Sequence, residues 1–413
     1  MSGQGAGKSL FHSPSWLVGF GPGLLVMLAD TDVSSVVTAA QSGVQWGYRL
    51  LLLQFLLIPV LYAAQELSAR LGLATGRGFI GLVEERYGRA IATTALAALA
   101  VSCFAALLTQ MGGLVGVGEM YGARRAVVVC AALVIIIAMV WSKSYQRVER
   151  FAIGLGLFEL AFLVAAWRSA PDGEKLVADM LSAPIGDHSF QLLVAANVGS
   201  AVIPWALVYQ QSAVVEKGFG PRDIARVRID TAAGVWLCQI ITAAILVAAA
   251  SALHNVGPDG LTSVGDIARA LGDMVSPEAS RAIFALGLSG SAMVATIVIG
   301  LALAWSLGEI GGLGKTSGRR PSEEPLFAAL FSCALALAGL LVLAAPGIVQ
   351  LAIGAAALNA FLLPFMLYLI FRLARDSMAG RLRLRGLEAV GVAVVFTLTA
   401  GLAFFSGVAA LLS

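Results

Sequence analysis

Two carboxylates lie two residues apart inside a long apolar run, and a hydroxyl group follows them closely. Asp30, Asp32 and Ser35 belong to a run that extends from about residue 16 to residue 40. A charged side chain at the centre of a bilayer costs roughly 2.5–3.5 kcal/mol on insertion scales, so such residues mark functional sites. Carboxylate and hydroxyl oxygens suit magnesium, calcium and manganese. The chemistry that these residues offer is therefore the binding of a metal cation.

The element that carries these residues is predicted to be a broken helix. In a continuous helix Asp30 and Asp32 would point in very different directions, whereas unwound backbone lets both face one cavity. Unwound backbone occurs within a membrane only where protein buries it or where it lines a water-filled site. A second break is indicated at Pro204, which lacks a backbone donor and follows Gly199 and Ser200. Pro204 alone could merely kink a helix, but corresponding breaks in two halves of a chain point to a transporter's substrate site.

The composition requires an integral membrane protein. Of the 413 residues 59% are hydrophobic and only 12% are charged, about half the charged fraction of a soluble domain. Apolar windows of about twenty residues predict eleven spans, at approximately 16–40, 48–71, 91–118, 125–142, 148–168, 190–213, 230–252, 281–307, 325–345, 348–373 and 386–412. We expect an all-α fold with a tail at 1–15, two inverted five-helix halves at 16–168 and 190–373, and an eleventh helix at 386–412.

The basic residues predict how the chain crosses the membrane. Most of the 27 lysines and arginines fall in the segments that are inside when the N-terminus is cytoplasmic. Cytoplasmic loops carry such an excess. We therefore expect a multi-pass protein of the inner (plasma) membrane with a cytoplasmic N-terminus.

No other chemistry is indicated along the chain. The four cysteines lie singly in apolar runs, without metal or redox spacing, and the three histidines fall in the tail or in polar loops. No nucleophile and base stand in register, so neither an enzyme nor a cofactor is expected. The stretches at 7–9 and 314–316 lack the earlier glycine and the strand of a phosphate-binding loop. The expected partners are a cation and the lipid bilayer, not nucleic acid, and the chain is expected to be a monomer.

Several stretches resemble one family of transporters. Residues 21–25 read GPGLL, residue 32 is the aspartate, and residues 41–43 read QSG. This pattern resembles the first helix of the NRAMP divalent-metal transporters, in which GPG, DPGN and QSG follow one another. The resemblance continues in QELSARLG (65–72), IFALGL (283–288) and LPF (363–365). It implies a LeuT-like fold with helices 1 and 6 broken at the midplane, and it places Asp32 on the family's metal-binding aspartate and Ser35 on its asparagine.

The chain departs from the family pattern at most of the positions that bind metal or move protons. DPGN becomes Asp-Val-Ser-Ser at 32–35, and the sixth-helix motif MPHN becomes Ile-Pro-Trp-Ala at 203–206. Gln210 stands where the family has a histidine, and Gln110 and Gly113 stand where it has two acids. Ala356 replaces a glutamine, and Asp30 is an added acid. With methionine and histidine gone, the chain is most similar to the family's magnesium-transporting branch.

The remaining donors suit a hard, partly hydrated cation. They are Asp32, Ser35, Asp30 and the backbone carbonyls freed at the second break, those of Ser200 and Ile203. Magnesium is usually held by one or two carboxylates and keeps several waters. The loss of the methionine is expected to widen the site. We therefore expect Mg²⁺ to be transported, and Mn²⁺ as well.

The loss of titratable residues predicts transport without protons. Histidine suits proton transfer because its unperturbed pKa is near 6.5, and neither family histidine is kept. A divalent ion gains roughly 4.6 kcal/mol per 100 mV of membrane potential, twice the single-charge value. Four further residues are expected along the pathway: Asn197, Trp205, Gln210 and Glu159. Glu159 and Asn197 could instead be structural.

Other functions remain open at this point. A proton-coupled Mn²⁺ or Fe²⁺ symporter is the main alternative, with Asp30 or Glu159 replacing the lost proton groups. A carrier of amino acids on the same scaffold is disfavoured, because a substrate carboxylate would meet two aspartates. A sensor that no longer transports is a further alternative, although the sequence shows no appended soluble domain.

Overall fold

A computed structural model describes residues 21–141, 154, 157–251, 261–271, 276–310, 325–344 and 347–411, and every regular element among them is helical. The first half contains α1 (Pro22–Asp30), α2 (Val33–Trp46), α3 (Leu51–Thr75), α4 (Phe79–Tyr87), α5 (Arg89–Met120), α6 (Arg125–Trp141), η2 (Leu157–Leu160) and α8 (Ala161–Arg168). The second contains α9 (Gly173–Met180), α10 (His188–Ala201), α11 (Pro204–Glu216), η3 (Pro221–Asp223), α12 (Ile224–Ser251), α13 (Val264–Ala270), α14 (Pro277–Ile310), α15 (Pro325–Ala344), α16 (Ile348–Ser377), η6 (Gly380–Leu382) and α17 (Gly386–Leu411).

The apolar helices coincide with the spans expected from the sequence. Within the described residues seven helices are long and apolar enough to cross a membrane, and the bent pair α1 and α2 makes an eighth. The shorter apolar helices α6 and α15 lie at the fourth and ninth expected spans. Of the fifth expected span, 148–168, only residues 154 and 157–168 are described, and they include η2 and α8. The all-helical class is thus confirmed, and eight of the eleven expected spans are long apolar helices or a bent pair within the described residues.

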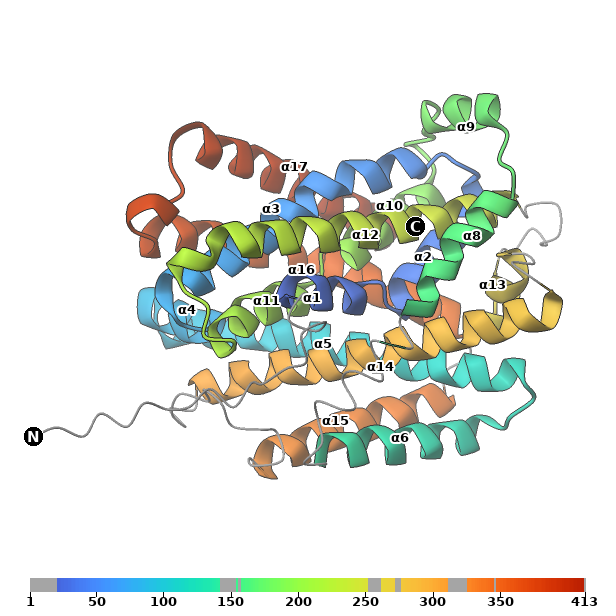
Figure 1. The fold of residues 1–413 in the computed structure, drawn as a ribbon, viewed down its shortest axis with the longest axis horizontal. Helices are drawn as coiled ribbons and strands as arrows, with labels where there is room; N and C mark the ends of the chain where they lie inside the picture. The colour runs from blue at the N-terminus through green and yellow to red at the C-terminus, as the bar shows by residue number, and fades with distance from the viewer. Residues whose placement is uncertain are drawn as a thin grey trace, which may run out of the picture.

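The broken helices lie inside the bundle (Figure 1). The long helices run roughly along the horizontal axis of the view, with α6 and α15 at one edge and α17 at the other. α2 packs against α12, and α10 packs against α16 and α17. The two broken helices are therefore held by continuous ones on several sides.

Glycines, which have no side chain, let these helices approach closely. A Cβ atom on Gly199 of α10 would lie 1.9 Å from the carbonyl oxygen of Ala356 in α16. A Cβ on Gly43 of α2 would lie 2.3 Å from the carbonyl oxygen of Leu246 in α12. Small residues at helix contacts are typical of membrane bundles, because van der Waals packing drives association there. Both glycines are therefore required by the packing of the broken helices.

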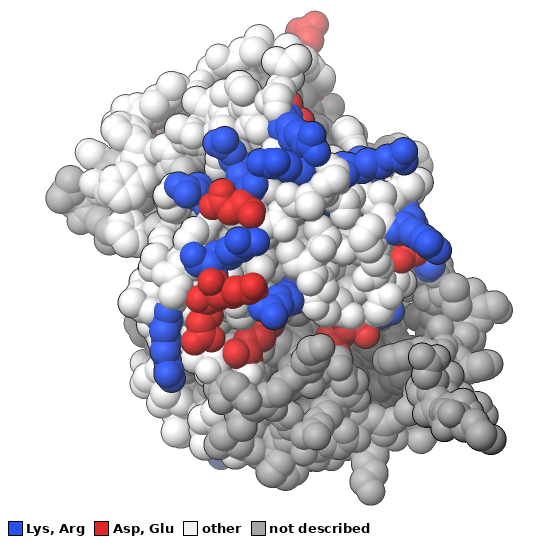
Figure 2. Space-filling view, turned by 90° about the vertical axis from the view of Figure 1, so that its left-hand side faces the viewer, with Lys and Arg blue, Asp and Glu red and all other residues white. Residues whose placement is uncertain are grey.

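One end of the bundle carries a dense group of charges. Figure 2 shows lysine and arginine side chains gathered on this face, with acidic side chains between them. Arg70 of α3 contributes a buried part of this group, where it pairs with Glu66 and Glu388 at 2.8 Å each. Of the connections that the sequence predicts to be cytoplasmic, the described ones between α3 and α4, α11 and α12, and α16 and α17 lie at this end (Figure 1).

Candidate metal-cation site

The first break is made by Asp32 itself. α1 ends at Asp30 and α2 begins at Val33, with a bend of 52° between them. Asp32 has extended backbone and is the N-cap of α2: its Oδ1 accepts the backbone N–H of Ser35 at 2.9 Å. Aspartate is among the best N-cap residues. The break therefore persists even though the proline and glycine of the family pattern are replaced by Val33 and Ser34.

The other carboxylate oxygen of Asp32 is bound by Gln110 of α5. Gln110 Nε2 donates to Asp32 Oδ2 at 2.7 Å, and its Oε1 accepts the N–H of Val33 at 3.4 Å. Asp32 is 1% exposed, and both of its oxygens accept hydrogen bonds from neutral donors. Sequence reasoning did not place Gln110 in the site. Its one signal was its position, where the resemblance puts an acidic residue.

Gly113 is the second position where the resemblance puts an acidic residue, and it has no room for a side chain. A Cβ on Gly113 would lie 2.3 Å from Cγ2 of Val33. Because α5 approaches the start of α2 so closely here, an acid at residue 113 would displace one of the two helices.

The second break is caused by Pro204, as predicted. α10 ends at Ala201 and α11 begins at Pro204. In a continuous helix the carbonyl of Ser200 would accept a hydrogen bond from residue 204, but proline has no N–H to donate. The hydroxyl of Ser35 lies 3.2 Å from that carbonyl oxygen and 2.7 Å from the carbonyl oxygen of Asp30. Ser35 therefore joins the two breaks and brings three oxygens together beside Asp32.

Asn197 holds the broken helices together on the side away from Asp32. Its Nδ2 donates to Ser42 Oγ at 2.8 Å, two turns beyond Ser35 on α2, and its Oδ1 accepts from Gln54 Nε2 at 2.6 Å. All three side chains are buried. These contacts favour the structural interpretation of Asn197 over a role as a metal ligand.

The carbonyl of Ile203 is used by its own helix. It accepts the N–H groups of Ala206 at 3.1 Å and Leu207 at 3.3 Å, which are the first hydrogen bonds of α11. The first turn of a helix needs such acceptors. The carbonyl of Ser200 is therefore the better candidate ligand of the two that the sequence suggested.

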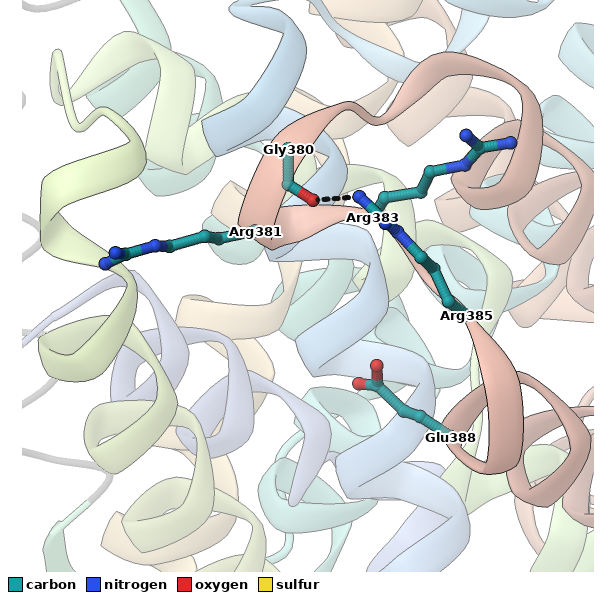
Figure 3. A pocket seen from close by; sticks show the side chains of 5 residues that line it. All are labelled: Gly380, Arg381, Arg383, Arg385 and Glu388. Carbon is teal, nitrogen blue, oxygen red and sulfur yellow. Dashed lines mark hydrogen bonds between the residues drawn. The ribbon is translucent and has the colours of Figure 1, made fainter.

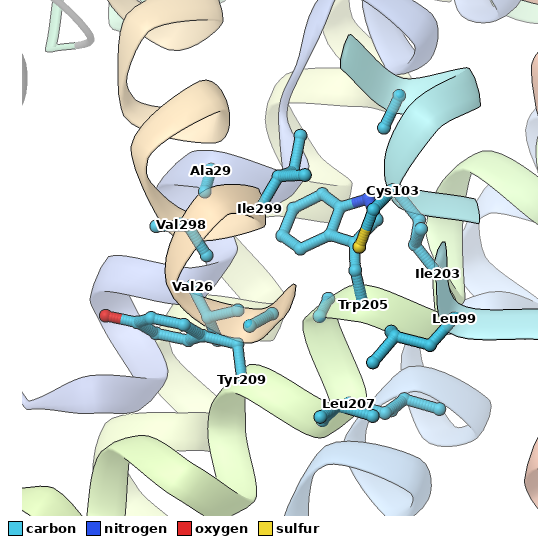
Figure 4. Close-up of a cluster of buried hydrophobic side chains, with 14 of the residues drawn as sticks. Val26, Ala29, Leu99, Cys103, Ile203, Trp205, Leu207, Tyr209, Val298 and Ile299 are labelled. Carbon is cyan, nitrogen blue, oxygen red and sulfur yellow. The ribbon is translucent and has the colours of Figure 1, made fainter. Parts of the chain in front are cut away.

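Trp205 forms an apolar wall behind the break. The side chain is completely buried, and its ring lies among Cys103, Ile203 and Ile299 (Figure 4). Its Nε1 has no hydrogen-bond partner among the described residues. The loss of the methionine predicted a wider site, but the indole ring of Trp205 fills space beside the break. The expected pathway residue Gln210 is also buried, and its Nε2 donates to Thr231 of α12 at 3.2 Å.

Asp30 is a buried carboxylate without a counter-charge. Its Oδ1 makes no hydrogen bond within the described part of the chain, and its Oδ2 has only the thiol of Cys238 at 4.0 Å. It is fully buried and close enough to Asp32 for the two carboxylates to repel each other. Among the described residues no lysine or arginine forms an ion pair with either aspartate. Buried charges are normally paired or bound to metal, so this pair favours a cation.

Glu159 contributes a third buried acid near the same place. It belongs to η2, which packs on α14 beside Gly287 and Ser291. Neither carboxylate oxygen makes a hydrogen bond to a described residue, and the hydroxyl of Ser291 donates instead to the carbonyl of Leu288 at 3.2 Å. α14 also packs against α1, the helix that ends at Asp30. The structure thus brings three of the predicted acids into one region.

The donor set is that of a hard cation site with few protein ligands. Within the described ranges no three histidine, cysteine, aspartate or glutamate side chains lie close enough to hold a metal ion together. A cation at the breaks would be bound by one or two carboxylates, by hydroxyl and carbonyl oxygens, and by water. Magnesium is commonly bound in this way.

The fold and the site together define a class of protein. Two broken helices that meet at a buried acidic site, inside a bundle of apolar spans, are the architecture of a transporter with a LeuT-like fold. The chain belongs to the Nramp family: residues 23–408 match the family described as natural resistance-associated macrophage protein-like.

Relatives and solved structures agree with this assignment. The divalent metal cation transporter MntH of Brucella suis biovar 1 is 27% identical in an alignment 296 residues long, which covers 68% of this chain and 65%, just under two thirds, of that protein. MntH 1 of Pseudomonas aeruginosa is 26% identical in an alignment 378 residues long, which covers 86% of this chain and 83% of that protein.

The fold itself is seen in two solved structures of low sequence identity. The manganese transporter of Eremococcus coleocola has a TM-score of 0.69 at 16% identity, covering 98% of this chain and 90% of that one. Mhp1, a nucleobase-cation-symport-1 family transporter, has a TM-score of 0.58 at 12% identity, covering 95% and 91%. The LeuT-like fold is thus confirmed, and the family is one of transporters rather than enzymes.

Proposed function

We propose that the chain transports divalent metal cations across the membrane, with Mg²⁺ as the main substrate and Mn²⁺ as a second one, and that no proton moves with the ion. The observation that carries the proposal is the pair Asp30 and Asp32, buried at a helix break without a counter-charge. The descriptions of the relatives as divalent metal cation transporters support the class of substrate. The description of the Eremococcus coleocola protein as a manganese transporter supports Mn²⁺.

The preference for Mg²⁺ rests on the oxygen donors around the breaks. Asp32, the Ser35 hydroxyl and the carbonyl oxygens of Asp30 and Ser200 are all hard ligands. Ile203 presents an aliphatic side chain where the family pattern has a methionine. On binding, the Ser35 hydroxyl turns its proton away and offers its oxygen, while waters complete the shell that Mg²⁺ releases reluctantly.

The absence of proton coupling rests on the groups that surround Asp32. The position of one family acid is held by Gln110, whose amide does not titrate and is already bound to Asp32. The position of the other is Gly113, which the packing against Val33 keeps free of a side chain. The membrane potential alone then drives the divalent ion inward.

Proteoliposomes that contain a magnesium dye and a pH dye test this proposal. Mg²⁺ should be taken up in response to an inside-negative potential without a change in the lumenal pH, and Asp32→Ala should abolish this uptake. Ser35→Ala should weaken it several-fold. Ser34→Ala is the matched control, because the Ser34 hydroxyl donates to Ala352 at 3.3 Å and lies outside the oxygen cluster. Uptake of Mn²⁺ without uptake of Mg²⁺ would refute the substrate assignment.

Glu159 favours a second candidate function, a proton-coupled Mn²⁺ or Fe²⁺ symporter. A buried carboxyl without a hydrogen-bond partner among the described residues could carry the proton. In that case wild-type uptake acidifies the lumen, and Glu159→Gln removes the acidification. Under the uncoupled proposal neither protein changes the lumenal pH.

We also propose a topology for the chain. The N-terminus is cytoplasmic, the membrane is the plasma membrane, the halves 16–168 and 190–373 are inverted repeats, and the protein is a monomer. A cysteine introduced for the exposed Tyr121, between α5 and α6, should react with impermeant maleimide from outside. One introduced for Ala379, between α16 and α17, should react only after permeabilisation. The reverse pattern would invert the topology.

A further inference from the structure

In the connection between α16 and α17 the arginine side chains are exposed, whereas the apolar side chains between them are buried. Its backbone is extended at Arg383, with φ −65° and ψ 129°, and successive side chains of an extended segment point to opposite faces. The apolar side chains of this connection are buried and the basic ones are exposed: the buried ones are Met378, Leu382 and Leu384, and the exposed ones are Arg381, Arg383 and Arg385. The apolar contacts therefore fix the segment that presents the three guanidinium groups.

These arginines line a shallow cavity at the end of the bundle. Gly380, Arg381, Arg383, Arg385 and Glu388 surround a volume of about 470 Å³ (Figure 3). Arg385 Nη2 donates to the carbonyl of Gly380 at 2.8 Å and closes the loop on itself. The guanidinium groups of Arg381 and Arg383 extend to either side of this bond (Figure 3). Three of the five residues that line the cavity are therefore arginines, and Glu388 is the one acidic residue among the five.

That charge is not neutralised by the neighbouring acid. Glu388 Oε1 lies 2.8 Å from Nη2 of the buried Arg70, so its charge is already shared with another arginine. Among the described residues no carboxylate lies within 4.0 Å of a side-chain nitrogen of Arg381, Arg383 or Arg385. The N-terminus of α17 starts at Gly386 and adds further positive potential. An anionic group would therefore be attracted into the cavity.

The cavity lies where a bilayer presents its headgroups. α16 and α17 are both long apolar helices, so the connection between them is at the boundary of the hydrocarbon. An exposed apolar stripe begins two residues after Arg385 and follows one face of α17: it consists of Leu387, Val390, Val394 and Leu398, with exposed fractions of 90%, 59%, 51% and 68%. Acyl chains can lie along this stripe while the headgroup occupies the cavity.

We propose that this cavity binds the phosphate-bearing headgroup of an anionic phospholipid of the adjacent leaflet. Basic pockets beside membrane spans bind such headgroups, and each arginine near the surface contributes about 1 kcal/mol. That corresponds to roughly five-fold in affinity for each arginine, and to about 100-fold for the three together. The proposal does not depend on which ion the protein carries.

Native mass spectrometry of the full chain, in detergent with equal amounts of phosphatidylglycerol and phosphatidylcholine, tests the proposal. The wild type should retain phosphatidylglycerol preferentially, and each of R381Q, R383Q and R385Q should lose about five-fold of that preference. The triple variant should lose nearly all of it. R168Q is the matched control, because Arg168 is also exposed at a helix end and has no carboxylate within 4.0 Å among the described residues.

Two results would overturn the proposal. Equal retention of both lipids by the wild type, or retention of phosphatidylglycerol by the triple variant, would show that the arginines do not select the headgroup. Soluble glycerol phosphate is added as a competitor, to distinguish binding of a lipid headgroup from binding of a free phosphate. If it displaces the lipid at equal concentration, the cavity is an anion site open to water and the assignment to a lipid is wrong. Size-exclusion profiles of the variants check that they remain folded.

Discussion

Asp32 has two physical roles that substitutions can separate. It caps α2 through the N–H of Ser35, and it places a buried negative charge beside Asp30. Asparagine caps a helix about as well as aspartate, whereas alanine loses about 1 kcal/mol. Asp32→Asn keeps the cap and removes a buried charge, but it places an amide NH₂ opposite Gln110 Nε2, so the hydrogen bond of 2.7 Å between them is lost. Asp32→Ala should be less stable than Asp32→Asn by about 1 kcal/mol.

Thermal unfolding with and without Mg²⁺ checks both roles of Asp32. Added Mg²⁺ should raise the Tm of the wild type, since it binds the folded state, but it should raise neither variant's. An equal rise in Asp32→Asn would mean that the ion binds without the Asp32 charge.

Gln110 is predicted to matter for stability because it binds a charge. Gln110→Leu leaves Oδ2 of Asp32 without its donor at 2.7 Å, and hydrogen bonds to charged groups are worth roughly 1.5–3 kcal/mol. Gln210→Leu is the matched control, since that buried amide binds only the hydroxyl of Thr231, a bond worth roughly 0.5–1.5 kcal/mol. Chemical denaturation in metal-free buffer should rank the losses in that order. Mg²⁺ should reduce the loss in Gln110→Leu alone, and equal losses would contradict this account.

At the scale of elements, the helices could be predicted from the sequence and the contacts between them could not. The apolar windows predicted the spans, and Pro204 predicted the second break, because both signals are local. The contact of Gln110 with Asp32 joins residues 78 positions apart, and no periodicity encodes it. The sequence predicts a free carbonyl at Ile203, whereas in the structure this oxygen accepts the N–H groups of Ala206 and Leu207 in the first turn of α11, a pairing that the sequence pattern does not show.

The glycines of the GPG stretch are explained by a contact with α12. Asp230 accepts the N–H groups of Gly21 at 2.9 Å and Gly23 at 2.7 Å, so it caps the start of α1. A Cβ on Gly21 would lie 2.1 Å from Oδ2 of Asp230. The sequence pattern showed the glycines, but only the packing of α1 on α12 shows why no side chain fits there.

Asp230→Asn should therefore loosen α1. The amide keeps the size of the carboxylate but loses its charge and one of the two acceptors, which corresponds to roughly 1.5–3 kcal/mol. Hydrogen exchange across residues 24–30 should become faster. Asp223→Asn is the control, because Asp223 accepts the N–H of Gly220 at 2.9 Å in a partly buried turn just before α12. Unchanged exchange in Asp230→Asn would show that the helix contacts alone hold α1 in place.

At the scale of the whole molecule, uncoupled transport makes the ion's final distribution depend on voltage alone. A divalent ion gains roughly 4.6 kcal/mol for each 100 mV, so at equilibrium an inside-negative potential of 100 mV concentrates it roughly 2,000-fold. Proteoliposomes with potentials set by potassium and valinomycin should approach this ratio at low external Mg²⁺. A pH gradient imposed at constant potential should leave the ratio unchanged, because no proton shares the step. If the ratio shifts with that gradient, protons are coupled to the ion, and Glu159→Gln then identifies whether the buried third acid carries them.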